Sequence, residues 1–239
     1  MKILVIAAHP DDEVLGMGGT IKKHTKAGDE VRVLIMATGI HARRSHNLKN
    51  ISTYNVSKKI TKKMDEQVKE LEEDARKTAK LLGVKKISFV RFPDNEMDKV
   101  SNLEITKIIE KNIREYLPKV VYTHSHYDIN IDHRACYFAT LTATRPVQNQ
   151  SVKEVISFEV PSSTEWYFPL QFSPNIFIDI SGEISTKIKA LKFYKNEIKD
   201  FPHPRSEEAI KVISQRWGSV SGCKNAEAFY LVRKTLGSL

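Results

Sequence analysis

Short apolar runs alternate with amphipathic segments over most of the chain. Residues 2–8 and 31–37 are almost continuously apolar, which is typical of strands that are buried on both faces of a parallel sheet. Residues 12–27 between them have helical spacing, and Gly28 follows as a residue type that commonly ends helices. The pattern therefore predicts a β–α–β unit at the start of the chain.

The same alternation continues to the end of the sequence. A further helix is expected at 68–82, before Gly83, and another begins after the capping-box sequence Ser101-x-x-Glu104. Later helices are expected from about 132, through 188–191 and through 210–213, and strands at 87–90, 120–123, 154–160, 175–180 and 228–232. This order predicts an α/β fold, in which a Rossmann-like, mostly parallel sheet carries helices on both faces, as a single domain over residues 1–239.

Length and composition narrow the class of protein. A chain of 239 residues and 27.3 kDa is long enough for one domain with a sizeable core. No apolar run approaches the roughly 18 residues that a membrane span needs, and the first apolar stretch is too short for a secretory leader. The chain contains two cysteines, Cys136 and Cys223. They are far apart in sequence, which suits a reducing compartment. We therefore expect a cytoplasmic protein without a membrane span.

Much of the net charge of +9 lies in one segment. Residues 42–63 contain no acid and carry the basic residues Arg43, Arg44, Lys49, Lys58, Lys59, Lys62 and Lys63. We interpret the segment as a basic loop that is either a solvated face or a means of attracting an anionic substrate, such as a phosphorylated or nucleotide-linked one. A nucleic-acid partner is not expected, because Tyr54 is the only aromatic residue in the segment.

Ionisable residues are packed together where the first strand ends, in His9-Pro10-Asp11-Asp12-Glu13. In open α/β sheets, ligands bind at the carboxyl ends of the strands. One aspartate would suffice to cap the following helix, and this cluster holds more than a cap requires. We therefore interpret it as part of a functional site.

A second cluster follows the strand expected at 120–123. Its ionisable members include His124, His126, Asp128, Asp132 and His133. If both clusters meet at one edge of the sheet, two imidazoles and one carboxylate can hold a single cation. Three protein ligands leave one coordination position open, as in catalytic zinc sites.

These two motifs, His9-Pro10-Asp11-Asp12-Glu13 and Asp132-His133-Arg134, resemble those of the PIG-L (LmbE-like) family of zinc-dependent N-deacetylases. The similarity extends through residues 18–20, 92–95, 162–166, 204–206 and 226–229. It implies an LmbE-like fold and a metal-dependent hydrolase. The implied reaction removes the acetyl group from an N-acetylated amino sugar or from its nucleotide or glycoside conjugate.

The resemblance also implies roles for individual residues. His9, Asp12 and His133 match the family's metal ligands, and Asp11 matches its general base, which acts on a water activated by the metal. Zinc is the implied cofactor, and iron(II) or cobalt(II) would accept the same ligands. The implied partner is a small N-acetyl sugar, and the oligomeric state stays open.

Two further expectations concern the surroundings of the ligand histidines. In metal sites, the second ring nitrogen of a ligating histidine usually donates to a carboxylate. Asp128 or Asp132 is expected to accept from His133, and Glu13 from His9.

The sequence departs from the family pattern at Asn130, where many relatives place a histidine. An asparagine amide can donate a hydrogen bond to developing negative charge, but it cannot transfer a proton. His203 is our candidate for the missing acid. The competing interpretation is an ordinary surface histidine between two prolines.

Four residues are assigned to substrate binding: Arg43, Arg44, Asp94 and Arg205. The first three follow predicted strands and are expected to hold sugar hydroxyls or a phosphate, although each suits a surface ion pair equally well. Arg205 lies in the matching segment 204–206.

Two other function classes stay open. A non-haem iron(II) oxygenase also uses two histidines and one carboxylate, and a basic module without catalysis would bind polyanions. Asp11 argues against the oxygenase, because hydrolysis needs such a base and oxygenation does not.

Overall fold

One sheet contains strands from both ends of the chain. The computed structural model describes residues 1–42 and 58–237. The seven strands of the sheet have the order β3-β2-β1-β4-β5-β7-β6. They are β1 (Lys2–Ala7), β2 (Glu30–Ala37), β3 (Lys86–Phe92), β4 (Val120–His124), β5 (Glu154–Phe158), β6 (Ile176–Asp179) and β7 (Ala226–Lys234). β3, β2, β1, β4 and β5 are mutually parallel, and β7 is antiparallel to β5 and β6. This arrangement confirms the predicted mostly parallel sheet.

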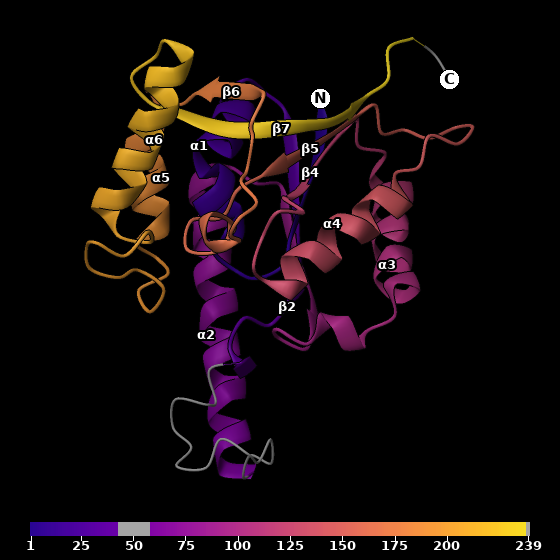
Figure 1. The fold of residues 1–239 in the computed structure, drawn as a ribbon. Coiled ribbons are helices and arrows are strands. Elements are labelled where there is room, and N and C mark those ends of the chain that lie inside the picture. Colours follow the sequence, from indigo (N-terminus) through magenta and orange to yellow (C-terminus); the bar gives the residue numbers. More distant parts are fainter. Residues whose placement is uncertain (43–57, 238–239) are drawn as a thin grey trace.

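Helices cover both faces of this sheet (Figure 1). One face carries α1 (Asp12–Lys26), α2 (Lys58–Leu82), α5 (Ile184–Leu191) and α6 (Glu207–Ser221), and the other carries α3 (Asn102–Tyr116) and α4 (Ile131–Ala143). Two short 3-10 helices, η2 (Met97–Lys99) and η3 (Thr164–Trp166), lie in the connections. Because side chains alternate along a strand, Ile3 and Val5 enter one buried cluster while Leu4 and Ile6 enter the other.

Several of the predicted helix ends are found where expected. Gly28 and Gly83 follow α1 and α2 with positive φ angles of 83° and 86°, and Ser101 Oγ accepts from the first backbone N–H groups of α3. The prediction of a loop over residues 42–63 was wrong for its last part, because α2 already begins at Lys58. The apolar stripe of α2 extends back to Met64, which is buried, and the lysines before it continue the same helix. Within the described residues, no helix combines the length and the apolar character of a membrane span.

The start of α1 is held close to the sheet by a glycine. A Cβ atom on Gly16 would lie 2.4 Å from Cδ2 of Phe158 and 2.7 Å from the carbonyl oxygen of Glu159, so a larger residue would push the helix away. This close approach fixes the first turn of α1, and with it Asp12, at the carboxyl edge of the sheet.

Candidate active site

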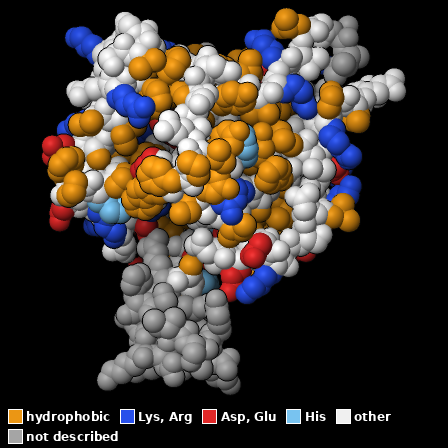
Figure 2. Space-filling model, viewed as in Figure 1, with side chains coloured by type: hydrophobic (Ala, Val, Ile, Leu, Met, Phe, Trp, Pro, Cys, Tyr) orange, Lys and Arg blue, Asp and Glu red, His pale blue; other side chains and the backbone are white. Residues whose placement is uncertain are grey.

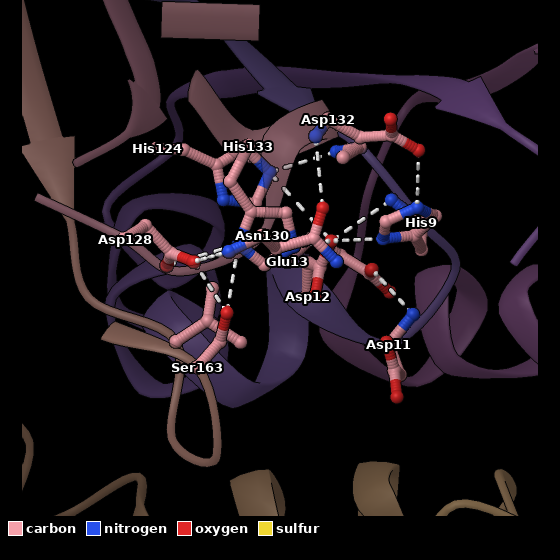
Figure 3. Close-up of polar contacts among 12 residues, drawn as sticks. His9, Asp11, Asp12, Glu13, His124, Asp128, Asn130, Asp132, His133 and Ser163 are labelled. Atoms are coloured by element: carbon pink, nitrogen blue, oxygen red, sulfur yellow. Dashed lines mark hydrogen bonds and ion pairs between the residues drawn. The ribbon is translucent and has the colours of Figure 1, made fainter. Parts of the chain in front are cut away.

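The two ionisable clusters meet at one edge of the sheet, as the sequence predicted. β1 and β4 are adjacent and parallel, with Ile3 beside Val120, so their carboxyl ends lie side by side. His9 follows β1, and His133 lies in the first turn of α4, shortly after β4. Both imidazoles face the carboxylate of Asp12 (Figure 3).

Asp12 lies between these two imidazoles. Its Oδ2 atom is 3.3 Å from His9 Nδ1 and 3.2 Å from His133 Nε2. One ligand atom of each residue lies within 4.8 Å of the other two, and all three residues are buried. This spacing suits one cation held by the three side chains.

Two atoms of this cluster lack a hydrogen-bond partner. Asp12 Oδ1 and His133 Nε2 are buried and make no hydrogen bond within the described part of the chain, although buried polar atoms are nearly always satisfied. A cation between them would satisfy both atoms. Two imidazoles and one carboxylate suit zinc and also accept iron or cobalt. The residues present therefore fit the metal that the resemblance implies.

Carboxylates hold the far nitrogen of each imidazole. His133 Nδ1 lies 3.0 Å from Asp128 Oδ2, so Asp128 is the one of the two expected residues that contacts His133. His9 Nε2 lies 3.0 Å from Asp132 Oδ2 and 3.2 Å from Asp94 Oδ1. Each imidazole is thereby fixed with its other nitrogen toward Asp12.

A second group of possible metal ligands consists of His9, Asp94 and Asp132. Asp132, however, already accepts hydrogen bonds from the backbone N–H groups of Asn95 and Met97, at 2.7 and 3.0 Å. We therefore interpret Asp132 as a support for His9 and as an anchor of the neighbouring loop. The first group remains the better cation site, because only that group contains buried atoms without hydrogen bonds.

Glu13 does not hold His9, and this expectation was wrong. Its Oε2 accepts from the backbone N–H of Asp11 at 3.1 Å, and its Oε1 accepts from the hydroxyl of Tyr194 at 2.6 Å. The side chain turns back over the start of α1, while Asp132 reaches His9 from α4. Burial raises the pKa of Glu13 to about 7. Asp11 has a φ of 114°, which is uncommon outside glycine, and Glu13 braces this turn.

Arg205 contacts Asp11. Its Nη1 donates to Asp11 Oδ2 at 2.7 Å and to Glu197 Oε2 at 3.2 Å, while its Nε donates to Ser162 Oγ at 2.6 Å. Burial raises the pKa of Asp11 well above its usual value, and the charge of Arg205 opposes that shift. The residue expected to bind substrate is therefore in direct contact with the expected base.

The charges of the cluster favour a cation at its centre. Burial by itself would raise the pKa of Asp12, but the positive charge of the nearby His133 and the contact with His9 lower it well below its usual value. Burial would lower the pKa of His133, but the carboxylates of Asp12 and Asp128 raise it to about 9. The carboxylates thus attract positive charge, which either a proton or a metal ion can supply.

A pocket of about 100 Å³ opens beside this cluster. The predicted site residues that line it are His9, Asp11, Asp94, Asn130 and Arg205. A small ligand in the pocket would therefore lie against the expected base and against one expected metal ligand. Arg43 and Arg44 lie outside the described residues, and their roles stay predictions.

Asn130 caps α4. Its Oδ1 accepts from the backbone N–H of Asp132 at 2.8 Å, which stabilises the turn that carries His133. Its side-chain NH2 group has no hydrogen-bond partner among the described residues, and Asn130 borders the pocket. That NH2 group is therefore available to donate to a bound oxygen.

His203 is near the site but is not among the residues that line the pocket. Its Nδ1 accepts from the backbone N–H of Arg205 at 3.1 Å, and its ring centroid is 6.2 Å from that of Trp166. Burial lowers the pKa of His203. Its role as an acid stays a prediction.

The stacking of His124 on His133 was not predicted from the sequence. This ring lies parallel to that of His133, with centroids 4.0 Å apart and an interplanar angle of 18°. Its Nε2 accepts from the backbone N–H of Ala8 at 2.7 Å, which joins β4 to the turn after β1. The one feature of the sequence that could have indicated this role is the position of His124 at the end of a buried strand.

Comparisons with known proteins agree with this geometry. The family model described as PIG-L, GlcNAc-PI de-N-acetylase, matches residues 4–144. Diacetylchitobiose deacetylase of Thermococcus kodakarensis is 29% identical over 237 residues, which cover 97% of this chain and 83% of the relative. N,N′-diacetylchitobiose deacetylase from Pyrococcus horikoshii, solved with an inhibitor, matches with a TM-score of 0.75 and 25% identity over 97% of this chain and 84% of that chain.

A protein that is named for a different activity has a similar fold. GalB, the 4-carboxy-2-hydroxymuconate hydratase from Pseudomonas putida, matches with a TM-score of 0.72 and 20% identity over 100% of this chain and 98% of that chain. Such a likeness concerns the fold alone, because one fold can host different functions. The family model, in contrast, spans more than half of the sequence, including His9, Asp12 and His133. This chain therefore belongs to the PIG-L (LmbE-like) family.

Proposed function

We propose that this chain is a metal-dependent deacetylase that removes the acetyl group from an N-acetylated amino sugar. The proposal is carried by the position of Asp12 between His9 and His133, with Asp11 at the edge of the adjacent pocket. A cation held by three protein ligands and a nearby carboxylate base are the two components that amide hydrolysis requires. The names of the relatives from Thermococcus kodakarensis and Pyrococcus horikoshii, both diacetylchitobiose deacetylases, support the choice of an N-acetylated sugar.

Zinc is the proposed metal, and when bound it would polarise the amide carbonyl and lower the pKa of a water to about 7. Asp11 takes the proton of the attacking water and delivers it to the nitrogen of the departing amine. The C–N bond then breaks, and acetate and the free amine are released. The contact with Arg205 favours the ionised form of Asp11 that the first step needs.

Asn130 is the proposed donor to the carbonyl oxygen as negative charge develops on it. Its free NH2 group beside the pocket supports this role. His203 is proposed as an additional acid, on its position next to Arg205 alone. Arg43, Arg44 and Asp94 are proposed to contact the sugar or a phosphate attached to it. We also propose that residues 1–239 form one domain, because the sheet includes strands from both ends of the chain.

The experiment is a measurement of acetate release by the purified protein after reconstitution with zinc(II). N-acetylglucosamine, N,N′-diacetylchitobiose and a nucleotide-linked N-acetyl sugar form the substrate panel. Release of acetate that is lost in Asp11→Asn, while the bound zinc is retained, is the expected result. A reconstituted protein that releases no acetate from any of these substrates contradicts the proposal.

The same assay separates the competing functions. A hydratase, which the likeness to GalB brings into view, would add water to a double bond and release no acetate. An iron oxygenase would need molecular oxygen, so acetate release under nitrogen argues against it. A basic module would bind polyanions in a salt-dependent manner and hydrolyse nothing.

A further inference from the structure

Two segments that resemble the PIG-L family have no part in the proposed reaction, and they contact one another inside the fold. Residues 18–20 lie in α1, and residues 226–229 begin β7. Glu227 accepts from the backbone N–H of Gly19 at 2.9 Å and from that of Thr20 at 2.7 Å, one with each carboxylate oxygen. These contacts span 208 and 207 residues of sequence. A carboxylate of β7 therefore holds the backbone of α1.

α1 is interrupted at the point of this contact. Met17 has a φ of −148° and a ψ of 25°, which are not helical, and it separates a first turn, residues 12–16, from a longer second part. Such a break leaves backbone groups without their helical partners. In an uninterrupted helix the N–H of Gly19 would donate to the carbonyl oxygen of Leu15. Here the N–H of Gly19 donates to Glu227, and the Leu15 oxygen accepts from Lys187 Nζ at 2.8 Å.

Lys187 and Glu227 form a buried ion pair. Lys187 Nζ lies 2.6 Å from Glu227 Oε1, and each residue is 4% exposed. Lys187 is the only buried lysine among the residues that the structure describes, whereas charged side chains usually lie at the surface, as those seen in Figure 2 do. The cavity that borders Leu15 and this pair has a volume of about 10 Å³, which is room for about one water. Solvent therefore cannot take over the contacts of the pair.

Stability by itself does not account for this ion pair. Both charges lose their hydration on burial, and a buried pair is often no more stabilising than apolar side chains of similar volume. The effect that apolar side chains could not supply is directional. The ammonium holds a carbonyl of the first turn, and the carboxylate holds two N–H groups of the second part. The pair thus fixes the angle between the two parts of α1.

The first turn carries Asp12, so this angle affects the metal site. Leu15 is bound at both of its backbone groups, because its N–H donates to the carbonyl oxygen of Asp11 at 2.9 Å and its own oxygen accepts from Lys187. Asp12 Oδ2 lies 3.3 and 3.2 Å from the nearest nitrogens of His9 and His133. Ligand distances in metal sites are held to within about 0.2 Å. A small rotation of the first turn would therefore move Asp12 out of position.

We propose that Lys187 and Glu227 are positioning residues for the metal site, because they hold the first turn of α1 at the angle at which Asp12 meets His9 and His133. The inference rests on the metal site of the proposed function and does not depend on the substrate. Neither Lys187 nor Glu227 lines the pocket beside the site. Both act through Asp12, and neither is a catalytic residue.

The double variant Lys187→Met/Glu227→Gln tests the inference. It removes both charges together, so that neither is left buried alone, and it removes the donor to Leu15. We expect its zinc affinity, measured by competition with a chelator, to fall about tenfold, as for other residues that orient metal ligands. Lys26→Met is the matched control, since Lys26 pairs with Glu183 at 2.7 Å and joins α1 to the start of α5 beyond the break. Its zinc affinity should stay within about twofold of wild type.

Two further variants separate positioning from a general loss of stability. Glu227→Asp keeps both charges but shortens the side chain by one methylene, so the carboxylate cannot reach both N–H groups and Lys187 at once. Its zinc affinity should fall between about twofold and tenfold. Ile113→Val removes a methylene from the buried cluster under α3. It should lower the thermal stability and leave the zinc affinity unchanged.

Hydrogen exchange provides a measurement that needs neither zinc nor turnover. It is followed by mass spectrometry on the metal-free wild type, the double variant and Lys26→Met. Peptides that cover the first turn of α1 should exchange at least about tenfold faster in the double variant, because their local protection depends on the pair. Peptides of α3 should exchange at the wild-type rate in all three proteins.

The outcomes for this inference and for the proposed function are distinguishable. Zinc affinity and hydrogen exchange that match the wild type in both variants of the pair overturn the inference, whether or not acetate is released. An equal loss of zinc affinity in Lys26→Met or Ile113→Val also overturns it. If the double variant does not fold, Glu227→Asp decides by the same criteria.

The proposed function can fail while the inference holds. A wild-type protein that binds zinc and releases no acetate, with the expected losses of zinc affinity in the variants of the pair, supports the inference and contradicts the proposed function. A wild-type protein that binds no zinc overturns both.

Discussion

Arg205 donates a hydrogen bond to Asp11 at 2.7 Å, although 194 residues separate the two along the chain. The contact joins the loop before α6 to the turn before α1. It places a permanent positive charge against the carboxylate that we propose as the base. The ionisation of Asp11 is therefore set by two opposing effects, burial and this charge.

Replacing Arg205 should shift the pH dependence of the reaction. The charge of Arg205 lowers the pKa of Asp11, so Arg205→Ala should raise that pKa further. As the pH is lowered, Asp11 then becomes protonated, and inactive as a base, at a higher pH than in the wild type. The acidic limb of the kcat profile should move upward by about 1 to 3 pH units. Arg205→Lys keeps a charge and should move it less. An unchanged acidic limb in Arg205→Ala, with activity retained, would show that Asp11 does not limit the rate.

Asn130 has two separable functions, helix capping and hydrogen-bond donation to substrate. Aspartate also caps helices but has no NH2 group, so Asn130→Asp should keep stability while kcat falls about 10²- to 10³-fold. Asn130→Ala should lose both the activity and about 1 kcal/mol of stability. Thermal unfolding and kcat measured on the same preparations check this. Full activity in Asn130→Asp would remove the amide from the mechanism.

Asp128 should control metal affinity without being a ligand. It holds His133 Nδ1 at 3.0 Å and accepts from Thr164 Oγ1 at 2.7 Å and from Ser163 Oγ. Asp128→Asn should weaken zinc binding about 10- to 100-fold, because the carboxylate that orients the imidazole is lost. His24→Ala is the control, since His24 lies in α1 and pairs with Asp29. Competition with a chelator measures the zinc affinity of each variant and of the wild type. An Asp128→Asn variant that binds zinc as tightly as His24→Ala would contradict the role of Asp128 in orienting His133.

Glu159 should make stability depend on pH. Burial raises its pKa from 4.5 to about 7, although the indole of Trp217 donates to its carboxylate. The folded state therefore binds a proton more tightly than the unfolded state, so stability is highest below pH 4.5 and falls as pH rises toward 7. Each pKa unit corresponds to about 1.4 kcal/mol at most.

Glu159→Gln cannot titrate and should lack this contribution. The free energy of unfolding from urea titrations is compared for the variant and wild type between pH 5 and pH 8. The difference between them should change in favour of the variant as pH rises. A difference that stays constant over this range would show that Glu159 is ionised throughout in the folded protein.

The alternation of strands and helices was predictable because each element repeats its own period along the chain. The apolar runs of β1, β2 and β4 were long enough to identify, and Gly28, Gly83 and Ser101 marked helix ends through local backbone geometry. The start of α2 was misplaced, because its first residues are lysines that carry no apolar period.

The apolar runs along the chain were enough to show that His9 and Asp12 follow one strand and that His133 follows another. Neighbouring parallel strands of an α/β sheet bring such ends together. In contrast, the pairing of each carboxylate with its imidazole and the contact of Arg205 with Asp11 became known from the folded chain alone. Asp132 and His9 are 123 residues apart, and Arg205 and Asp11 are 194 apart. Such contacts depend on how helices and loops pack against the sheet, and the spacing of apolar residues along the chain does not predict that packing.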